Sequence, residues 1–93
     1  MNQILKEEEL LQTADTVVDD AYKLVLYNDD YHTFDYVIES LVDICKQTYE
    51  QAEQCTLLVH YKGHCVIKSG NYDTLIPMHK ALLNKSLTSE ILH

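Results

Sequence analysis

The chain has 93 residues, 46% of them apolar, and a net charge of −8. This length and apolar fraction suit one domain with a single core, and so small a domain favours a surface groove over a deep catalytic cleft. The acidic balance, without any run of Lys or Arg, argues against nucleic-acid binding, which needs clustered positive charge. No apolar run approaches the roughly 20 residues of a membrane span, and no secretory signal pattern opens the chain, so we expect a cytoplasmic protein.

The first 21 residues differ in composition from the rest. They carry six acidic side chains against one lysine and contain no aromatic residue. A segment of this kind cannot bury enough apolar surface to order itself. We therefore expect residues 1–21 to form a flexible acidic N-terminal extension and residues 22–93 to form the folded domain.

The folded part opens with residues 22–27, a short aromatic and branched run that predicts a strand and is followed by polar turn residues. Apolar residues at helical spacing predict a first helix over residues 33–47. Thr48 and Gln51 form a capping-box pattern for a second helix, which Gly63 ends. The apolar stripe of this second helix is expected to include Ala52, Cys55, Leu58 and Val59.

Residues 65–67 predict a short second strand, with a turn at residues 69–71. Asp73 can cap a third helix, in which we expect Pro77 in or near the first turn because proline lacks a backbone N–H. Residues 87–92 alternate as a last strand. The order β-α-α-β-α-β predicts an α+β fold: a single compact domain in which a small antiparallel three-stranded sheet packs against three helices.

Two short segments carry the candidate chemistry. Residues 27–31, Tyr-Asn-Asp-Asp-Tyr, lie between the first strand and the first helix, and residues 59–63, Val-His-Tyr-Lys-Gly, close the second helix. Taken alone, the polar triplet at 28–30 favours a turn and helix cap, and His60 favours a partly buried structural histidine. Their combination favours a binding site.

Both segments, in this order and about this far apart, resemble the ClpS family over roughly residues 22–92. The resemblance implies a non-enzymatic adaptor without a cofactor, which binds the free N-terminus and first side chain of N-degron substrates, typically Leu, Phe, Tyr or Trp. It implies delivery to a Clp ATPase–ClpP protease by docking on the N-terminal domain of a ClpA- or ClpC-like AAA+ ATPase. Asp73 would stand at the docking face, and residues 1–21 would act in delivery.

The resemblance also implies how the substrate amino group is held. An α-ammonium needs acceptors in a fixed arrangement, preferably beside a carboxylate. Asn28 can present its carbonyl oxygen and a neutral His60 can accept on a ring nitrogen, while Asp29 and Asp30 supply negative potential. Asp29 matches the family position that contacts the peptide just beyond its first residue. An internal peptide would leave these polar groups unpaired, which would make recognition selective for termini.

A hydrophobic pocket between the first two helices is the third implication. Residues 32–34, His-Thr-Phe, stand where many members have Thr-Pro-Met, and Thr56 stands where a Met is usual, so the preferred first side chain stays open. The residues expected to line or flank this pocket are Leu26, His32, Phe34, Val37, Thr56, Leu57 and Val59.

Alternative functions stay open beside the adaptor. A general protein-interaction domain would bind partners without reading the α-amino group. A Cys–His nucleophile could pair Cys55 or Cys65 with His60, although no orienting group or oxyanion hole is evident. Gly63 interrupts the helix between His60 and His64, so we expect no zinc site. The cysteines are odd in number and are expected to be reduced and mostly buried: Cys45, Cys55 and Cys65.

Overall fold

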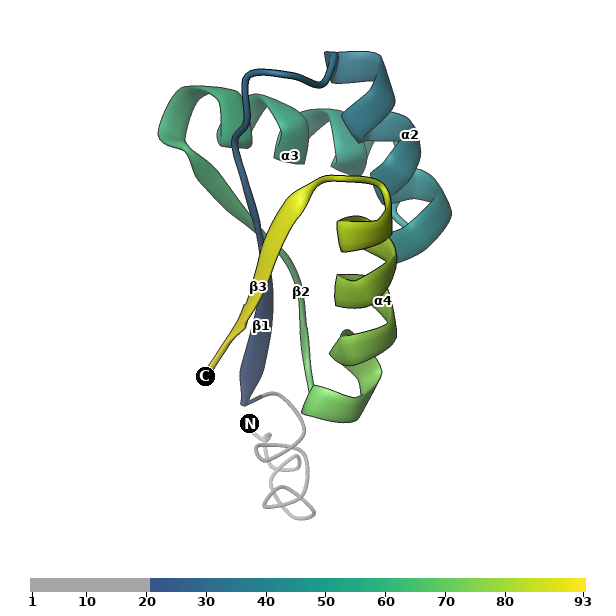
Figure 1. The fold of residues 1–93 in the computed structure, drawn as a ribbon, viewed down its shortest axis with the longest axis vertical. Helices are drawn as coiled ribbons and strands as arrows, with labels where there is room; N and C mark the ends of the chain where they lie inside the picture. The colour runs from purple at the N-terminus through teal and green to yellow at the C-terminus, as the bar shows by residue number, and fades with distance from the viewer. Residues whose placement is uncertain (1–20) are drawn as a thin grey trace, which may run out of the picture.

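A computed structural model describes residues 21–93. Residues 1–20, nearly all of the expected acidic extension, lie outside the described residues. The elements follow the predicted order (Figure 1): β1 (Tyr22–Tyr27), α2 (Phe34–Cys45), α3 (Tyr49–Lys62), β2 (His64–Gly70), α4 (Tyr72–Asn84) and β3 (Thr88–Leu92). The predicted α+β class and element order are confirmed.

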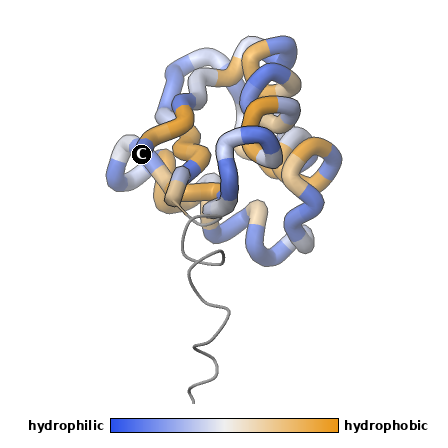
Figure 2. Tube along the Cα trace, turned by 90° about the horizontal axis from the view of Figure 1, so that it is seen from below, coloured by the Kyte–Doolittle hydropathy of each residue, from blue (hydrophilic) through white to orange (hydrophobic). Residues whose placement is uncertain are grey.

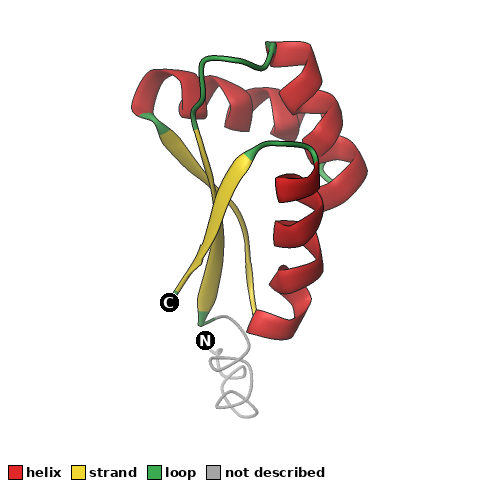
Figure 3. Cartoon of the chain, in the orientation of Figure 1, coloured by secondary structure: helices red, strands yellow, loops and turns green. Residues whose placement is uncertain are grey.

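The sheet has three antiparallel strands in the order β2-β1-β3, so the first strand of the chain is the central one. Leu26 near the end of β1 pairs with Cys65 on one side and with Ser89 on the other. In Figures 1 and 3, α4 runs beside the sheet, whereas α2 and α3 lie across the end where β1 finishes. The loop after β1 passes α3 and runs on to the start of α2 (Figure 1).

The core joins the central strand to one face of each helix. Its largest fully buried apolar side chains are Leu24 and Leu26 of β1, Leu41 of α2, and Leu75 and Leu82 of α4. Along the chain, hydrophobic and hydrophilic stretches alternate within each helix (Figure 2), as expected of helices with one buried face. Burying these side chains stabilises the fold by roughly 1.5–3 kcal/mol each.

Local capping sets where the helices begin and end. The Thr33 hydroxyl accepts from the backbone N–H of Tyr36 at the start of α2. The capping box predicted at Thr48 and Gln51 is formed at the start of α3, and Gly63 ends that helix in the left-handed region at φ 93°. A side chain at position 63 would meet no atom within 4 Å, so the backbone conformation and not space requires glycine there.

Two expectations about α4 were wrong. Asn71 and not Asp73 caps the helix, because the Asn71 side chain accepts from the Thr74 N–H, 2.8 Å away, while Asp73 lies exposed in the first turn. Pro77 is the sixth helical residue and falls in the second turn. The buried side chains Leu75 and Leu82 hold the helix together across the proline.

Two smaller differences concern α3 and β2. Leu58 is 42% exposed, and Thr56 takes its place in the buried face of α3. The Thr56 hydroxyl donates to the Ala52 carbonyl oxygen at 2.8 Å, which satisfies it in an apolar setting. β2 extends to Gly70, through the residues expected to turn, because it pairs with β1 along that strand's whole length. No described helix is long and apolar enough to cross a membrane.

Candidate functional site

One backbone hydrogen bond joins the two sequence segments. The Asn28 N–H donates to the Gly63 carbonyl oxygen at 3.0 Å. Beside it, Tyr27 at the end of β1 pairs with His64 at the start of β2. The polar loop after β1 is thereby fixed against the C-terminal end of α3, so residues 35 positions apart come to share one site.

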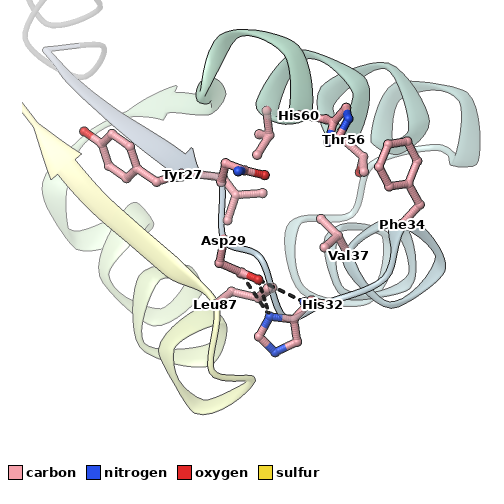
Figure 4. A pocket seen from close by; sticks show the side chains of 11 residues that line it. Tyr27, Asp29, His32, Phe34, Val37, Thr56, His60 and Leu87 are labelled. Atoms are coloured by element: carbon pink, nitrogen blue, oxygen red, sulfur yellow. Dashed lines mark hydrogen bonds and ion pairs between the residues drawn. The ribbon is translucent and has the colours of Figure 1, made fainter.

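A cavity of about 50 Å³ lies where these segments meet (Figure 4). Its walls come from the end of β1, the following loop, the facing sides of α2 and α3, and one residue just before β3. The lining residues are Leu26, Tyr27, Asn28, Asp29, His32, Phe34, Val37, Thr56, Val59, His60 and Leu87.

Most of the expected site residues line this cavity, and three do not. Asp30 is exposed on the loop, and Leu57 lies one position along α3 from the lining residue Thr56. Asp73 is at the start of α4, at the end of the molecule opposite the loop (Figure 1). Leu87 was not expected, because only the sheet order β2-β1-β3 brings it beside the end of β1. Tyr27 also lines the cavity and was not predicted to do so.

Asp29 is held within the loop by hydrogen bonds. Its Oδ1 accepts from the backbone N–H groups of Tyr31, at 2.8 Å, and His32, at 2.9 Å. Its Oδ2 lies 2.9 Å from Nδ1 of the His32 ring. Burial alone would raise the pKa of this carboxyl, but the hydrogen bonds from the His32 side chain and from the two backbone groups outweigh it and lower the pKa. Asp29 is therefore a carboxylate at neutral pH.

The His32 ring extends this arrangement to the neighbouring turn between α4 and β3. It stacks on the Tyr36 ring at 4.7 Å with an interplanar angle of 16°. The Tyr36 hydroxyl donates to the Lys85 carbonyl oxygen at 2.8 Å, and the Lys85 Nζ lies 5.8 Å from the centre of that ring. We call Asp29, His32, Tyr36 and Lys85 the loop clasp, because they tie the loop after β1 to the turn between α4 and β3.

The opposite wall carries an aromatic pair, Phe34 and His60. The two rings meet edge to face at 5.3 Å and 70°. Phe34 is 40% exposed, and His60 is exposed at the end of α3. Within residues 21–93, neither the His60 ring nor the Asn28 side-chain amide forms a hydrogen bond to the protein. Both groups therefore remain able to accept from a ligand at the mouth of the cavity.

The arrangement suits a small cation attached to an apolar side chain. Accepting groups stand at the mouth with a carboxylate beside them, and five apolar side chains also line the cavity: Leu26, Phe34, Val37, Val59 and Leu87. A positive charge held by neutral acceptors near a carboxylate gains charge-assisted hydrogen bonds, which are about twice as strong as neutral ones.

The cysteine chemistry is less suited to catalysis. Cys45 and Cys55 are buried, Cys65 is partly buried, and all three are free thiols. Burial raises the pKa of Cys45 to about 11, and burial together with the Cys65 neighbour raises the pKa of Cys55 well above its ordinary value. A protonated thiol is a poor nucleophile. Within the described residues, no group of three or more His, Cys, Asp or Glu side chains is placed to hold a metal ion.

A family model described as "ATP-dependent Clp protease adaptor protein ClpS" matches residues 18–90. The chain belongs to the ClpS family. A ClpS relative from Acetivibrio thermocellus is 42% identical over 52 residues, covering 56% of this chain and 52% of that relative. Another from Oleidesulfovibrio alaskensis is 38% identical over 60 residues, covering 64% of this chain and 52% of its own length. The chain thus spans about half the length of the ClpS relatives it matches.

A solved ClpS-family structure has the same fold. Agrobacterium tumefaciens ClpS2 bound to L-phenylalaninamide superposes with a TM-score of 0.64 at 18% identity, over 75% of this chain and 92% of that one. At this identity the likeness establishes the fold alone.

Proposed function

We propose that this ClpS-family protein binds the free N-terminus of peptides and buries their first side chain. The observation that supports the proposal is the pairing of two acceptors, Asn28 and His60, whose side chains form no hydrogen bond within residues 21–93, with a cavity lined in part by apolar side chains. The ligand of the similar ClpS2 structure, L-phenylalaninamide, combines a free α-amino group with an aromatic side chain. That combination has the chemistry that this cavity and its mouth would accept.

The cavity must widen to admit such a side chain. Its volume is about 50 Å³, whereas an engineered protein cavity that takes up benzene measures about 150 Å³. The loop clasp has hydrogen bonds at both of its ends and a ring stack between them, but the aromatic pair is held by a ring contact alone. We therefore place the opening movement at Phe34, whose ring would turn outward to make room.

Matched peptides test the proposal. The full chain is titrated with peptides that begin with Phe, Leu or Val and with acetyl-Phe, all otherwise identical. We expect the Phe and Leu peptides to bind and acetylation to weaken the Phe peptide about 10- to 100-fold, because it removes the charge and the donors. Equal binding of the free and acetylated Phe peptides would overturn N-terminal recognition and favour a general interaction domain.

We further propose that the protein delivers bound substrates to a Clp protease through the N-terminal domain of a ClpA- or ClpC-like ATPase. The support is the family membership together with the position of Asp73, exposed at the end of the fold away from the cavity. A partner could contact Asp73 while a peptide occupies the site. Asp73→Lys should weaken binding to the isolated ATPase domain and leave the affinity for a Phe peptide unchanged; loss of both would contradict separate faces.

Residues 1–21 are proposed to act during delivery and not in peptide binding. Deleting them should leave the affinity for a Phe peptide unchanged, because the described residues that line the cavity lie between Leu26 and Leu87. The same deletion should slow degradation of a Phe-started substrate by the reconstituted ATPase and protease at saturating substrate. Degradation at the full rate would assign this segment no part in delivery.

A further inference from the structure

Thr56 is a buried polar residue among the apolar walls of the cavity. It is 3% exposed, while its lining neighbours include Leu26, Val37 and Val59. The Thr56 hydroxyl donates its proton to the Ala52 carbonyl oxygen at 2.8 Å. A hydroxyl has one proton and two lone pairs, so the oxygen that has donated to Ala52 can still accept from a ligand.

The place of Thr56 along α3 matches the far end of a bound side chain. Thr56 comes four residues before His60, on the same face of the helix and about 6 Å along its axis. Figure 4 shows Thr56, Phe34 and Val37 gathered on the side of the cavity away from Tyr27 and Asp29. An amino group held at Asn28 and His60 would direct the para position of an aromatic side chain toward Thr56.

We propose that Thr56 makes this pocket selective for N-terminal tyrosine over N-terminal phenylalanine. The inference rests on the proposed function and names the first residue that the same site takes. Burying a phenol hydroxyl among apolar groups costs free energy unless the hydroxyl finds a partner. The Thr56 oxygen supplies that partner, and the hydrogen bond formed inside the pocket adds to the affinity for tyrosine. Phenylalanine carries no donor and gains nothing from Thr56.

Two independent comparisons test the inference. Peptides beginning with Tyr, Phe or O-methyl-Tyr are titrated into the full-length protein, Thr56→Val, which removes the hydroxyl, and Thr56→Ser, which keeps it. The ratio of Tyr to Phe affinity should fall about 3- to 10-fold in Thr56→Val and persist in Thr56→Ser. In the unaltered protein, O-methyl-Tyr should bind more weakly than Tyr, because its ether oxygen cannot donate.

The outcomes separate this inference from the proposed function. An unchanged Tyr-to-Phe ratio in Thr56→Val, or equal binding of Tyr and O-methyl-Tyr by the unaltered protein, overturns the role of Thr56 and leaves N-terminal recognition intact. Equal binding of free and acetylated Tyr peptides overturns N-terminal recognition itself, and the role of Thr56 with it. The O-methyl-Tyr comparison needs no variant, so equal binding of the two peptides overturns the role of Thr56 even where Thr56→Val does not fold.

Discussion

The two walls of the cavity are built in different ways. On one wall, the loop clasp joins a carboxylate, an imidazole, a phenol and a backbone carbonyl in one connected series. On the other, Phe34 and His60 contact each other only through their ring edges. The loop clasp is therefore suited to holding polar groups in fixed positions. The aromatic pair is suited to admitting side chains of different shapes.

Energies support that division. Hydrogen bonds to a charged group contribute about 1.5–3 kcal/mol when buried, and less where solvent screens them, as for the Asp29 and His32 side chains at 16% and 18% exposure. An aromatic edge contact contributes about 0.5–1.5 kcal/mol. Because the loop clasp contains several such bonds and the aromatic pair one contact, the pair should open first when a peptide arrives.

The largest expected effect comes from removing either of the two acceptors at the cavity mouth. Asn28→Ala and His60→Ala should each weaken binding of a Phe peptide about 10- to 100-fold, because each removes a hydrogen bond to the charged amino group. Isothermal titration measures the affinity. Both residues are exposed, so the melting temperature should stay close to that of the unaltered protein. Unchanged affinity in both folded variants would remove the assigned amino-group site.

The next largest effect is on the free energy of unfolding, and it distinguishes the loop clasp from the aromatic pair. Asp29→Ala removes the acceptor for two backbone N–H groups and for His32, so the free energy of unfolding should fall by about 1–2 kcal/mol. Asp29→Asn is the matched control, since it keeps a side-chain oxygen but loses the charge. Urea unfolding measures both. If Asp29→Ala lowered the free energy of unfolding no more than Phe34→Ala does, the loop clasp would not be the more strongly held wall.

Acid should abolish the stabilising contribution of Asp29. Its folded-state pKa is lowered below the usual carboxyl value, so its contribution is fully present above the unfolded-state pKa of about 3.9 and is lost as the pH falls through the folded-state value. The difference in unfolding free energy between the unaltered protein and Asp29→Asn should hold constant from about pH 5 to 7 and shrink below about pH 4. A difference that does not vary across this range would show that the charge contributes nothing.

The smallest expected effect on stability is at Phe34. Phe34→Ala should cost less than about 1 kcal/mol, because 40% of the residue is already exposed. It should instead change the ranking of first residues in a panel of Phe, Tyr, Leu and Val peptides, since the ring closes one side of the cavity. A large fall in melting temperature with an unchanged ranking would assign Phe34 to the core.

Local signals in the sequence were enough for the order of the elements, whereas the expected site residues came from the resemblance to the ClpS family, and most of them line the cavity. The capping box at Thr48 and the glycine at 63 are short-range chemistry, and both act as predicted. The cap of α4 was missed because Asn71 and Asp73 are equally good acceptors in principle, and the choice depends on where β2 ends. Leu87 could not be found locally, because the sheet order alone brings it to the cavity.

The role of Asp29 shows a different limit. A polar triplet after a strand indicates both a ligand-binding group and a turn, and the sequence does not rank these roles. In the folded chain the Asp29 carboxylate is occupied by the loop and by His32. It therefore shapes the loop, while the Asn28 amide and the His60 ring form no hydrogen bond within residues 21–93. Only the side-chain positions distinguish a residue that stabilises the loop from one that is available to bind a ligand.

The hydrogen bond from Asn28 to Gly63 has a consequence for how the chain tolerates insertions and deletions. Deleting one residue between His60 and Gly63 would turn the imidazole by about 100° around the axis of α3, away from the cavity. The three-residue step from His60 to Gly63 should therefore keep its length for as long as His60 has to face the cavity.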